Sequence, residues 1–521
     1  MRESACQLML RLPLLDEYLH EQHDLTAVER FSRAHDTLPA SSRYEALLPA
    51  TPPGPGQQYA FEVELDACSG CKACVTACHN LNGLDEGETW RAVGLLHGGT
   101  TIAPVQQTVT TACHHCLDPA CMNGCPVRAY EKDPVTGIVK HLDDQCIGCQ
   151  YCTFMCPYEV PQYNAKRGIV RKCDMCSGRL AAGEAPACVQ ACPNEAIAIR
   201  VIDQQQALDD AQGDAFLPGT PSPAITVPTT IYRTAHPPPR NLLPADFYTI
   251  RPSHHHVPLV VMLVLTQLSV GAFVVGDVLG RHLLQPAHAI AALTVGLAAL
   301  AASIFHLGRP LYAFRAVLGL RTSWMSREIV AFGGFAVLAM SYAAVSITGL
   351  GTAAFAEWLG YAVAAIGLVG IACSVLIYHV TRRAWWTASI TGFKFFMTAA
   401  LLGVASTLVL VPADVAAKLS QLVVAAAVIK LLGELTVLVH LHDKRYTEQR
   451  RTAVLLVGDL RRWSVARIAA LLLGGVLLPL VGQPSLARAI ASLALLLIGE
   501  LLERMLFFAA SSAPGMPKGA R

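Results

Sequence analysis

Cysteines dominate one stretch of this chain, and their spacing constrains its fold more than any other feature. Sixteen of the 18 cysteines lie between positions 68 and 192 in four groups of four, and every group starts with two cysteines three positions apart. In groups one and three a third cysteine follows at the same spacing, and a proline follows the last cysteine of groups two, three and four. The groups are Cys68, Cys71, Cys74 and Cys78; Cys113, Cys116, Cys121 and Cys125; Cys146, Cys149, Cys152 and Cys156; and Cys173, Cys176, Cys188 and Cys192.

This spacing is typical of iron–sulfur ligation. Sixteen thiolates suffice for four [4Fe–4S] clusters, and in bacterial ferredoxins three closely spaced cysteines hold one cluster while the fourth reaches its neighbour. A disulfide scaffold fits poorly, because cysteines three apart, three times running, cannot all find partners of suitable geometry. Structural zinc uses pairs with this spacing and would suit the fourth group alone. The segment is therefore predicted to carry electrons.

The second half of the chain is unusually apolar. Hydrophobic residues make up 53% of the sequence, and its mean hydropathy is +0.41. Eight apolar stretches follow position 256, and most of them reach the ~20 residues that span a hydrocarbon core of ~30 Å. They predict a polytopic helical membrane domain, in which the seventh stretch is the shortest. The stretches are 257–279, 286–307, 328–349, 358–380, 391–411, 415–440, 465–482 and 486–508.

Basic residues gather in the loops on one side of these stretches. Loops rich in Lys and Arg usually stay in the cytoplasm. We therefore expect both termini and the cysteine-rich segment on the cytoplasmic side of the cell (inner) membrane, in contact with membrane lipid. A net charge of +2 gives no indication of a nucleic-acid partner. The loops after even-numbered stretches carry Arg309, Arg315, Arg321, Arg327, Arg382, Arg383, Lys394, Lys444, Arg445, Arg450, Arg451, Arg461 and Arg462, against Arg281, Lys418 and Arg488 in the opposite loops.

Alternating residues predict short strands beside the cysteine groups. They lie at 61–65 before group one, at 137–141 before group three and at 196–201 after group four. A strand before a cysteine group and a helix after its fourth cysteine is the plan of ferredoxins. Two such pairs predict an α+β double ferredoxin-like iron–sulfur domain with an insertion, followed by an all-α polytopic membrane domain of eight transmembrane helices.

These patterns divide the chain into five parts. The first is an N-terminal amphipathic arm, with helices expected at 8–18 and 27–34, that ends in a Pro/Gly linker. The iron–sulfur domain, a Pro-rich linker, the membrane anchor and a C-terminal tail follow it. The predicted boundaries are 1–58, 59–202, 203–256, 257–510 and 511–521.

Residues 59–202 resemble the four-cluster subunit of the complex iron–sulfur molybdoenzymes, the group that includes dimethyl sulfoxide reductase. The stretches CHHCLDPACMNGCP, CIGCQYCTFMCPYEVPQYN and KCDMCSGRL carry this likeness. Residues 254–510 resemble the membrane-anchor subunit of the same reductase, through HLGRPLYAFRAVLGLRTSWMSREI (306–329) and GELLERMLFF (499–508). In that family the two subunits are commonly separate polypeptides, so this chain looks like a fusion of the two.

The resemblance also implies how the cysteine groups combine. Groups one and four share two clusters, groups two and three share the other two, and four irons are expected in each because all sixteen ligands are present. The order of the clusters along the electron path stays open. We name the implied sets A (Cys68, Cys71, Cys74 and Cys192), B (Cys173, Cys176, Cys188 and Cys78), C (Cys113, Cys116, Cys121 and Cys156) and D (Cys146, Cys149, Cys152 and Cys125).

The implied function is that of an electron-transfer and membrane-anchor subunit without terminal chemistry of its own. Menaquinol would be oxidised at the cytoplasmic edge of the membrane domain, and electrons would pass singly through four [4Fe–4S] clusters to a separate molybdopterin-containing catalytic subunit. That partner would reduce a small acceptor such as dimethyl sulfoxide in anaerobic respiration. Two alternatives stay open. A dehydrogenase partner, for example for formate, could send electrons to quinone, or the ferredoxin module could drive an ion-translocating membrane domain.

Quinol oxidation needs a proton acceptor at membrane depth, for which histidine and carboxylate side chains are suited. His306 ends the second apolar stretch and Glu328 begins the third, both on the predicted side of the cysteines. The resemblance implies that both bind quinol, since they match anchor positions associated with that role. The alternative is an interfacial His306 and a Glu328 favoured by the dipole of a helix that Ser326 caps.

Other polar residues of the membrane half have simpler interpretations. Haem is not expected, because the candidate histidines His379 and His440, like His306, lie at helix ends. Lys430 and Glu434 lie one helical turn apart, so pairing is the simplest interpretation, and a role in proton transfer stays open.

Overall fold

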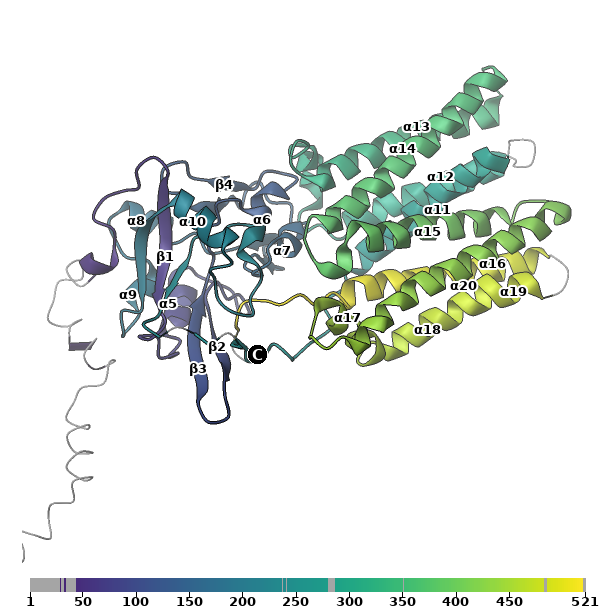
Figure 1. Ribbon diagram of the computed structural model, residues 1–521. Helices are drawn as coiled ribbons and strands as arrows, with labels where there is room; N and C mark the ends of the chain where they lie inside the picture. Colours follow the sequence, from purple (N-terminus) through teal and green to yellow (C-terminus); the bar gives the residue numbers. More distant parts are fainter. Residues whose placement is uncertain are drawn as a thin grey trace, which may run out of the picture.

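The computed structural model describes residues 29, 32–33, 44–236, 238–239, 241–279, 286–349, 351–481 and 485–518. The part of the chain before residue 257, called the soluble part below, consists of short strands and helices. A bundle of long helices follows it, and the two lie end to end (Figure 1). The helices expected in the N-terminal arm fall almost entirely outside the described residues.

A three-stranded sheet brings the two ends of the cysteine-rich segment together. Its central strand β1 (Gln57–Glu64) pairs antiparallel with β8 (Ile197–Asp203) and parallel with β9 (Ile231–Arg233). Phe61 of β1 lies opposite Ile199 of β8, and both are buried. This pairing places the strand before cysteine group one against the strand after group four, which brings those two groups close together.

Three antiparallel strand pairs fill the intervals between the cysteine groups. The first is the insertion between groups one and two, and a short strand, β10 (Leu243–Pro244), adds to its edge. The three predicted strands are present as parts of β1, β5 and β8. The pairs are β2 (Ala92–Gly99) with β3 (Pro104–Thr111), β4 (Tyr130–Lys132) with β5 (Val139–His141), and β6 (Gln162–Asn164) with β7 (Ile169–Arg171).

Five of the six α-helices described in the soluble part begin inside the cysteine groups, and the sixth, α10, follows group four only after β8, so the predicted placement of the helices after the fourth cysteine is wrong. In group one, α5 (Ala73–Leu81) contains the third and fourth cysteines, and in group three α7 (Tyr151–Met155) starts just before the third. The residues before these helices, Lys72 and Gln150, have left-handed φ values of 64° and 59°. The chain turns this sharply because three closely spaced thiols must face one point, and the helix follows at once. The remaining helices here are α6 (Ala120–Asn123), α8 (Ser177–Ala181), α9 (Ala187–Gln190) and α10 (Gln204–Gln212).

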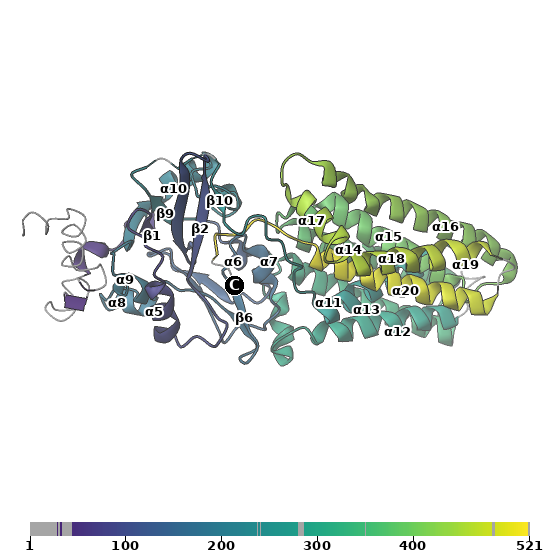
Figure 2. The same ribbon diagram turned by 90° about the horizontal axis from the view of Figure 1, so that it is seen from below.

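Seven helices among the described residues are long and apolar enough to cross a membrane. Figures 1 and 2 show them side by side in one bundle. They are α11 (Val257–Leu279), α12 (Pro286–Ile304), α13 (Trp324–Thr348), α14 (Ala353–His379), α15 (Ala388–Thr407), α16 (Ala413–Leu435) continued by η5 (Thr436–His442), and α18 (Arg461–Leu472) continued by η6 (Leu473–Leu477) and α19 (Leu478–Leu480).

The last apolar stretch forms a helix of similar length, α20 (Leu486–Ala509), with a different composition. Glu500, Glu503 and Arg504 lie in it, and none is more than 2% exposed. Charged side chains are costly at membrane depth, so α20 lacks the composition of an ordinary span. Eight helices thus match the eight apolar stretches, and seven of them have the length and composition of membrane spans.

The bundle packs around α11, which contacts α12, α14, α15 and α20. Its Gly271 meets the backbone of α15 so closely that a Cβ there would lie 1.9 Å from Ala399 O. Small residues allow such approach between membrane helices. Two elements at the end of the bundle nearest the soluble part were not predicted, namely η3 (Pro310–Val317) and α17 (Glu448–Val457).

Backbone contacts join the soluble part to the bundle. Arg309 N donates to Ile147 O at 3.0 Å, and Gly319 N donates to Pro126 O at 2.7 Å. Gly308 lies so near Gly168 that a Cβ at Gly308 would be 2.1 Å from Gly168 O. These contacts turn cysteine groups two and three toward the bundle.

The C-terminal segment ties the two parts together from outside (Figure 1). It leaves α20 and returns to the soluble part, where Met516 is 3% exposed and packs in a core with Leu65 and Leu96. Lys518 forms an ion pair with Glu159. The two ends of the membrane-anchor half are therefore both attached to the cysteine-rich half.

Candidate electron-transfer centre

The cysteines of the soluble part stand in four sets. Burial raises the pKa of most of these thiols, and within each set neighbouring thiols raise it further. These neighbours are the ones that sets A to D contain. They are Cys74, Cys192 and Cys71 around Cys68; Cys188 and Cys176 around Cys78; Cys156, Cys113 and Cys116 around Cys121; and Cys149, Cys125 and Cys146 around Cys152.

Backbone N–H groups point at sulfur atoms in the loops that carry the sets. Such donors favour the thiolate form, which is the form that binds metal. They reach the first cysteine of a group from two residues further on, and the last cysteine from four residues further on. The bonds are Gly148 N to Cys146 Sγ at 3.4 Å, Met175 N to Cys173 Sγ at 3.4 Å, Ala129 N to Cys125 Sγ at 3.2 Å and Ala196 N to Cys192 Sγ at 3.3 Å.

The sets fit iron–sulfur clusters. Burial raises the pKa of Cys156 to about 11, and a bound metal would favour the thiolate form of this side chain. When bound, iron–sulfur clusters supply one-electron transfer.

The four sets lie in a row. Cys188 of set B neighbours Cys74 of set A, and Cys173 of set B neighbours Cys113 of set C. Tyr130 lies between sets C and D, near Cys152 and Cys121. The order is therefore A, B, C and D, with D beside the helical bundle, a question that the spacing of the cysteines left open.

Two buried cations occupy the gaps between neighbouring sets. Arg91 is 2% exposed, donates from Nη1 to Thr110 Oγ1 at 3.2 Å, and lies with its guanidinium carbon 4.6 Å from the Phe61 ring centre. Burial lowers its pKa, but the thiolates of Cys188 and Cys74, from sets B and A, outweigh burial and the pKa is raised. Arg91 therefore stands where negative charge from two sets meets.

Lys172 is the corresponding buried cation between sets B and C. It is 3% exposed, and its Nζ donates to Cys173 O at 2.8 Å, to Val139 O, and toward Cys113 Sγ at 3.6 Å. The neighbouring thiolates raise its pKa against the effect of burial. In the described part of the chain, the hydrogen bonds of Lys172 and Arg91 go to backbone carbonyl, thiol and hydroxyl groups rather than to carboxylates. Sequence reasoning missed both cations, although Lys172 directly precedes Cys173.

Set D reaches the membrane bundle through Tyr151. Its hydroxyl donates to Ile377 O of α14 at 2.8 Å, and the side chain is 1% exposed. Burial, with smaller effects from Glu328 and Cys149, holds the Tyr151 pKa well above its usual range. Tyr151 therefore stands between a ligand of set D and the predicted quinol residue Glu328.

Glu328 and His306 have different surroundings. Glu328 of α13 is 6% exposed and accepts a hydrogen bond from Ser374 Oγ of α14. Ser326 does not cap this helix, because its hydroxyl donates to Ala316 O at 2.6 Å. His306 follows α12 and interacts with His256 and with the backbone of Ser303. Burial lowers the pKa of His306, so its ring is neutral at neutral pH.

A second group of polar residues lies inside the bundle, where α15, α16, α18 and α20 meet. Lys394, counted with the loop charges in the sequence, is inside α15 and pairs with Glu503 at 2.7 Å. Lys430 pairs with Glu434 at 3.1 Å, as expected, and also with Glu500 at 3.2 Å. Buried charges need partners, and here they find them across helices.

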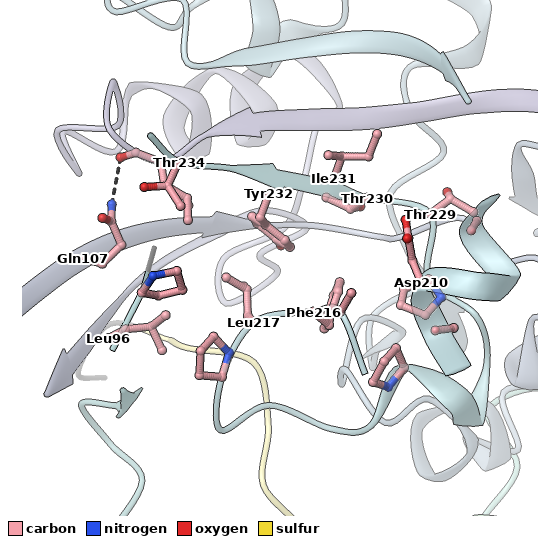
Figure 3. A pocket seen from close by; sticks show the side chains of 18 of the residues that line it. Leu96, Gln107, Asp210, Phe216, Leu217, Thr229, Thr230, Ile231, Tyr232 and Thr234 are labelled. Atoms are coloured by element: carbon pink, nitrogen blue, oxygen red, sulfur yellow. Dashed lines mark hydrogen bonds between the residues drawn. The ribbon is translucent and has the colours of Figure 1, made fainter. Parts of the chain in front are cut away.

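A cavity of about 920 Å³ opens on the soluble part away from the cysteine sets (Figure 3). Tyr232 of β9 and Phe216 and Leu217 of the loop after α10 point into it. Gln107 Nε2 donates to Leu65 O at 2.8 Å at one end. Its lining contains no cysteine, so it plays no part in holding a cluster.

Comparison with known proteins agrees with this geometry. Residues 105–202 match the 4Fe-4S dicluster domain family, and residues 251–510 match the DMSO reductase anchor subunit (DmsC) family. The sequence is 33% identical over 186 residues to the B subunit of anaerobic dimethyl sulfoxide reductase from Haemophilus influenzae, and the match covers 34% of this protein and 89% of that subunit. It is 38% identical over 155 residues to the probable anaerobic dimethyl sulfoxide reductase subunit YnfG of Escherichia coli K12, covering 28% and 75%.

A third relative has a different name. The hydrogenase-2 operon protein HybA of Escherichia coli O157:H7 is 37% identical over 172 residues, which cover 28% of this chain and 52% of that protein. The matches to the two halves are more informative than this single relative, because they place an iron–sulfur segment and an anchor segment in one chain. The protein is thus a multi-pass membrane protein with an iron–sulfur electron-transfer domain, and it belongs to the dimethyl sulfoxide reductase family as a fusion of that family's iron–sulfur and membrane-anchor subunits.

Proposed function

We propose that this protein oxidises menaquinol in the membrane and passes the electrons through four [4Fe–4S] clusters to a separate molybdopterin-containing subunit. That partner would reduce a small acceptor such as dimethyl sulfoxide. The observation that carries the proposal is the row of sets A to D, which ends beside the bundle at Tyr151 and Glu328. Set A, at the far end of the row, is the natural exit toward the partner, because Cys71 of that set is exposed.

Each set holds one cluster in this proposal, so all sixteen cysteines are ligands. The residues 59–202 form the iron–sulfur domain and 257–510 the anchor, joined by the linker 203–256. The buried cations Arg91 and Lys172 offset the negative charge of sets A, B and C, which makes it easier for clusters in these sets to receive an electron. Electrons then move between sets whose thiols are neighbours.

Glu328 and His306 are the proposed quinol residues. Oxidation of a quinol releases two electrons and two protons, so the site must accept protons close to the first electron acceptor. Glu328 offers a buried carboxylate near Tyr151 and set D, and His306 offers a neutral imidazole ring that can accept a proton. We assign Glu328 to binding and proton acceptance, and His306 to proton acceptance at the edge of the membrane.

The membrane arrangement follows from the charges. We propose that α20 is an eighth span, because its charged groups are paired inside the bundle rather than turned to lipid. Eight spans put both termini on one side, and the excess of Arg and Lys in the loops near the soluble part makes that side cytoplasmic. The iron–sulfur domain then faces the cytoplasm.

The test uses the full chain with its clusters reconstituted under anaerobic conditions in lipid vesicles. Iron and acid-labile sulfide should each approach sixteen per chain for four clusters, a number that follows from four irons per cluster. A reduced short-tailed naphthoquinone should bleach the cluster absorbance, and Glu328→Gln should slow this step by about 10²-fold or more while the iron content stays the same. Glu357→Gln, which changes an exposed carboxylate of α14, is the matched control. Unchanged bleaching in Glu328→Gln would rule out the proposed quinol site.

A further inference from the structure

A cavity of about 260 Å³ lies within the bundle, separate from Glu328 and His306. It is bounded by α15, α16, α17, α18 and α20, and most of its lining is apolar. The polar residues among its lining include Lys394, Glu434, Arg467 and Glu503, and the indole of Trp385 forms part of the wall. Small-molecule sites have this character, an apolar enclosure with a few polar groups that fix orientation.

Arg467 leaves hydrogen-bond donors unused in this cavity. The residue is 3% exposed, and its Nη2 lies 2.6 Å from Glu434 Oε2 and 3.7 Å from Glu500 Oε1. Its Nε and Nη1 have no hydrogen-bond partner among the residues that the structure describes. Arginine carries five N–H donors and no acceptor, and buried donors without partners are destabilising. The cavity therefore calls for a ligand that accepts hydrogen bonds.

The carboxylates around the cavity are already engaged. Glu503 is held by Lys394 at 2.7 Å and by Arg504 at 3.5 Å. Glu434 is held by Lys430 at 3.1 Å as well as by Arg467. This group of charged residues contains four cations for three carboxylates, so hydrogen-bond donors exceed acceptors. The cations are Lys394, Lys430, Arg467 and Arg504, and the carboxylates are Glu434, Glu500 and Glu503. Three of the carboxylate oxygens, Glu434 Oε1, Glu500 Oε1 and Glu503 Oε2, accept no hydrogen bond from a described residue, but each lies in an ion pair, so a ligand with O–H groups to donate would compete with these cations for them.

We infer that this cavity binds the oxidised ring of a membrane quinone, with a ring carbonyl accepting from Arg467 and the ring packing against Trp385. A quinone carries two carbonyl acceptors, no donors and no charge, which matches a donor-rich and apolar site. The inference rests on the proposed function only in that the membrane carrier is a quinone. The cavity differs from the site at Glu328 and His306, which offers hydrogen-bond acceptors and therefore suits the reduced ring.

An anionic phospholipid is the other class of ligand with strong acceptors, and basic pockets between helices bind such head groups. The position of Arg467 argues against it. Arg467 lies six residues beyond Arg461, which starts α18, so it is about 9 Å deeper along the helix. That depth places its free donors below the lipid phosphates and at the level of an apolar ring.

Aromatic side chains connect this cavity to the cysteine sets. Trp385 and Trp386 both donate from Nε1 to Phe507 O, at 3.2 Å and 3.1 Å. Trp386 packs edge-on against Phe154 with ring centres 5.5 Å apart. Phe154 lies in the chain between Cys152 of set D and Cys156 of set C. A quinone held here would therefore sit beside the electron path but apart from the site of quinol oxidation.

The test measures equilibrium binding of a radiolabelled short-tailed naphthoquinone, oxidised or as its hydroquinone, to the full cluster-loaded chain in vesicles of zwitterionic lipid. Arg467→Leu removes the donors, and Val465→Trp fills the cavity from a residue that is 58% exposed without touching the ion pairs. Val337→Trp on α13, also 58% exposed, is the matched control for a large residue added to the bundle surface.

We expect Arg467→Leu and Val465→Trp each to weaken binding of the oxidised ring by about tenfold or more, with little effect on the hydroquinone. Val337→Trp should leave binding of the oxidised ring unchanged. Wild-type binding in both cavity variants would overturn the inference, as would a phospholipid that copurifies with the chain and resists displacement by the naphthoquinone. Loss of quinol oxidation in Glu328→Gln is a separate readout, so either site can fail without the other.

Discussion

Removing the charge of Lys172 should lower the reduction potentials of the clusters proposed for sets B and C more than those of the clusters proposed for sets A and D. Lys172 lies between sets B and C, 3.6 Å from Cys113 Sγ and bonded to Cys173 O, and its hydrogen bonds among the described residues go to carbonyl and thiol groups rather than to a carboxylate. A nearby positive charge favours the reduced cluster because reduction adds negative charge. Lys172→Met removes that charge, and Lys172→Gln removes it while keeping a donor for the two carbonyls.

The magnitude follows from Coulomb's law. With roughly 7 Å from the ammonium to the centre of either cluster and an effective dielectric constant of about 20, the interaction is about 2.4 kcal/mol. For a one-electron couple this energy corresponds to about 100 mV, and relaxation of the surroundings reduces it, so we expect both potentials to fall by ~50–100 mV. Sets A and D lie one step further from Lys172 and should shift by less than half as much.

The assay is a potentiometric titration followed by electron paramagnetic resonance, which resolves the clusters by their spectra. Lys166→Met, which removes a cation whose side chain is 77% exposed, is the control and should change none of the four potentials measurably. Potentials that stay constant in both Lys172 variants, or that all fall equally, would refute the role assigned to this lysine.

Three further predictions follow from the structure. Burial lowers the pKa of His306, so the ring stays neutral, and able to accept a proton, down to pH values below its ordinary pKa. The rate of quinol oxidation should therefore fall only on the acid side of the ordinary histidine pKa. His306→Gln should abolish this acid limb in a pH–rate profile. Gly308→Ala should push the soluble part away from the bundle, since its Cβ would meet Gly168 O at 2.1 Å, and should cost about 1–3 kcal/mol of stability in thermal unfolding, whereas Gly333→Ala, with nothing within 4 Å, should be neutral. Met516→Ala should destabilise the attachment of the C-terminal segment by about 2–3 kcal/mol, measured by protease cleavage of the tail, and rapid cleavage in the unaltered chain would contradict the burial described above.

Several features of the chain could be predicted because they depend on neighbours in sequence. The spacing from Cys146 to Cys156 indicates a cluster-binding loop whatever surrounds it, since three thiols spaced three positions apart must converge on one point. The long apolar stretches indicate helices because only a helix satisfies its own backbone inside a membrane. Local patterns also predicted strands at β1, β5 and β8. They misplaced the helices, since a left-handed residue such as Lys72 leaves no signal in the apolar pattern.

Other features were decided only when distant segments came together. The row of sets A to D, with D beside the bundle, depends on pairings such as β1 with β8, which no local spacing encodes. Tyr151 meets Ile377, 226 residues further along the chain, and Lys394, which counts as a loop charge in the sequence, finds Glu503 inside the bundle. Arg91 and Lys172 look like ordinary basic residues until burial places each between two sets of thiolates. The sequence by itself determined which groups this protein can hold, because ligand spacing and apolar length are local. The tertiary structure decided the order of those groups and the charges around them, because contact, burial and electrostatic interaction depend on distance in space.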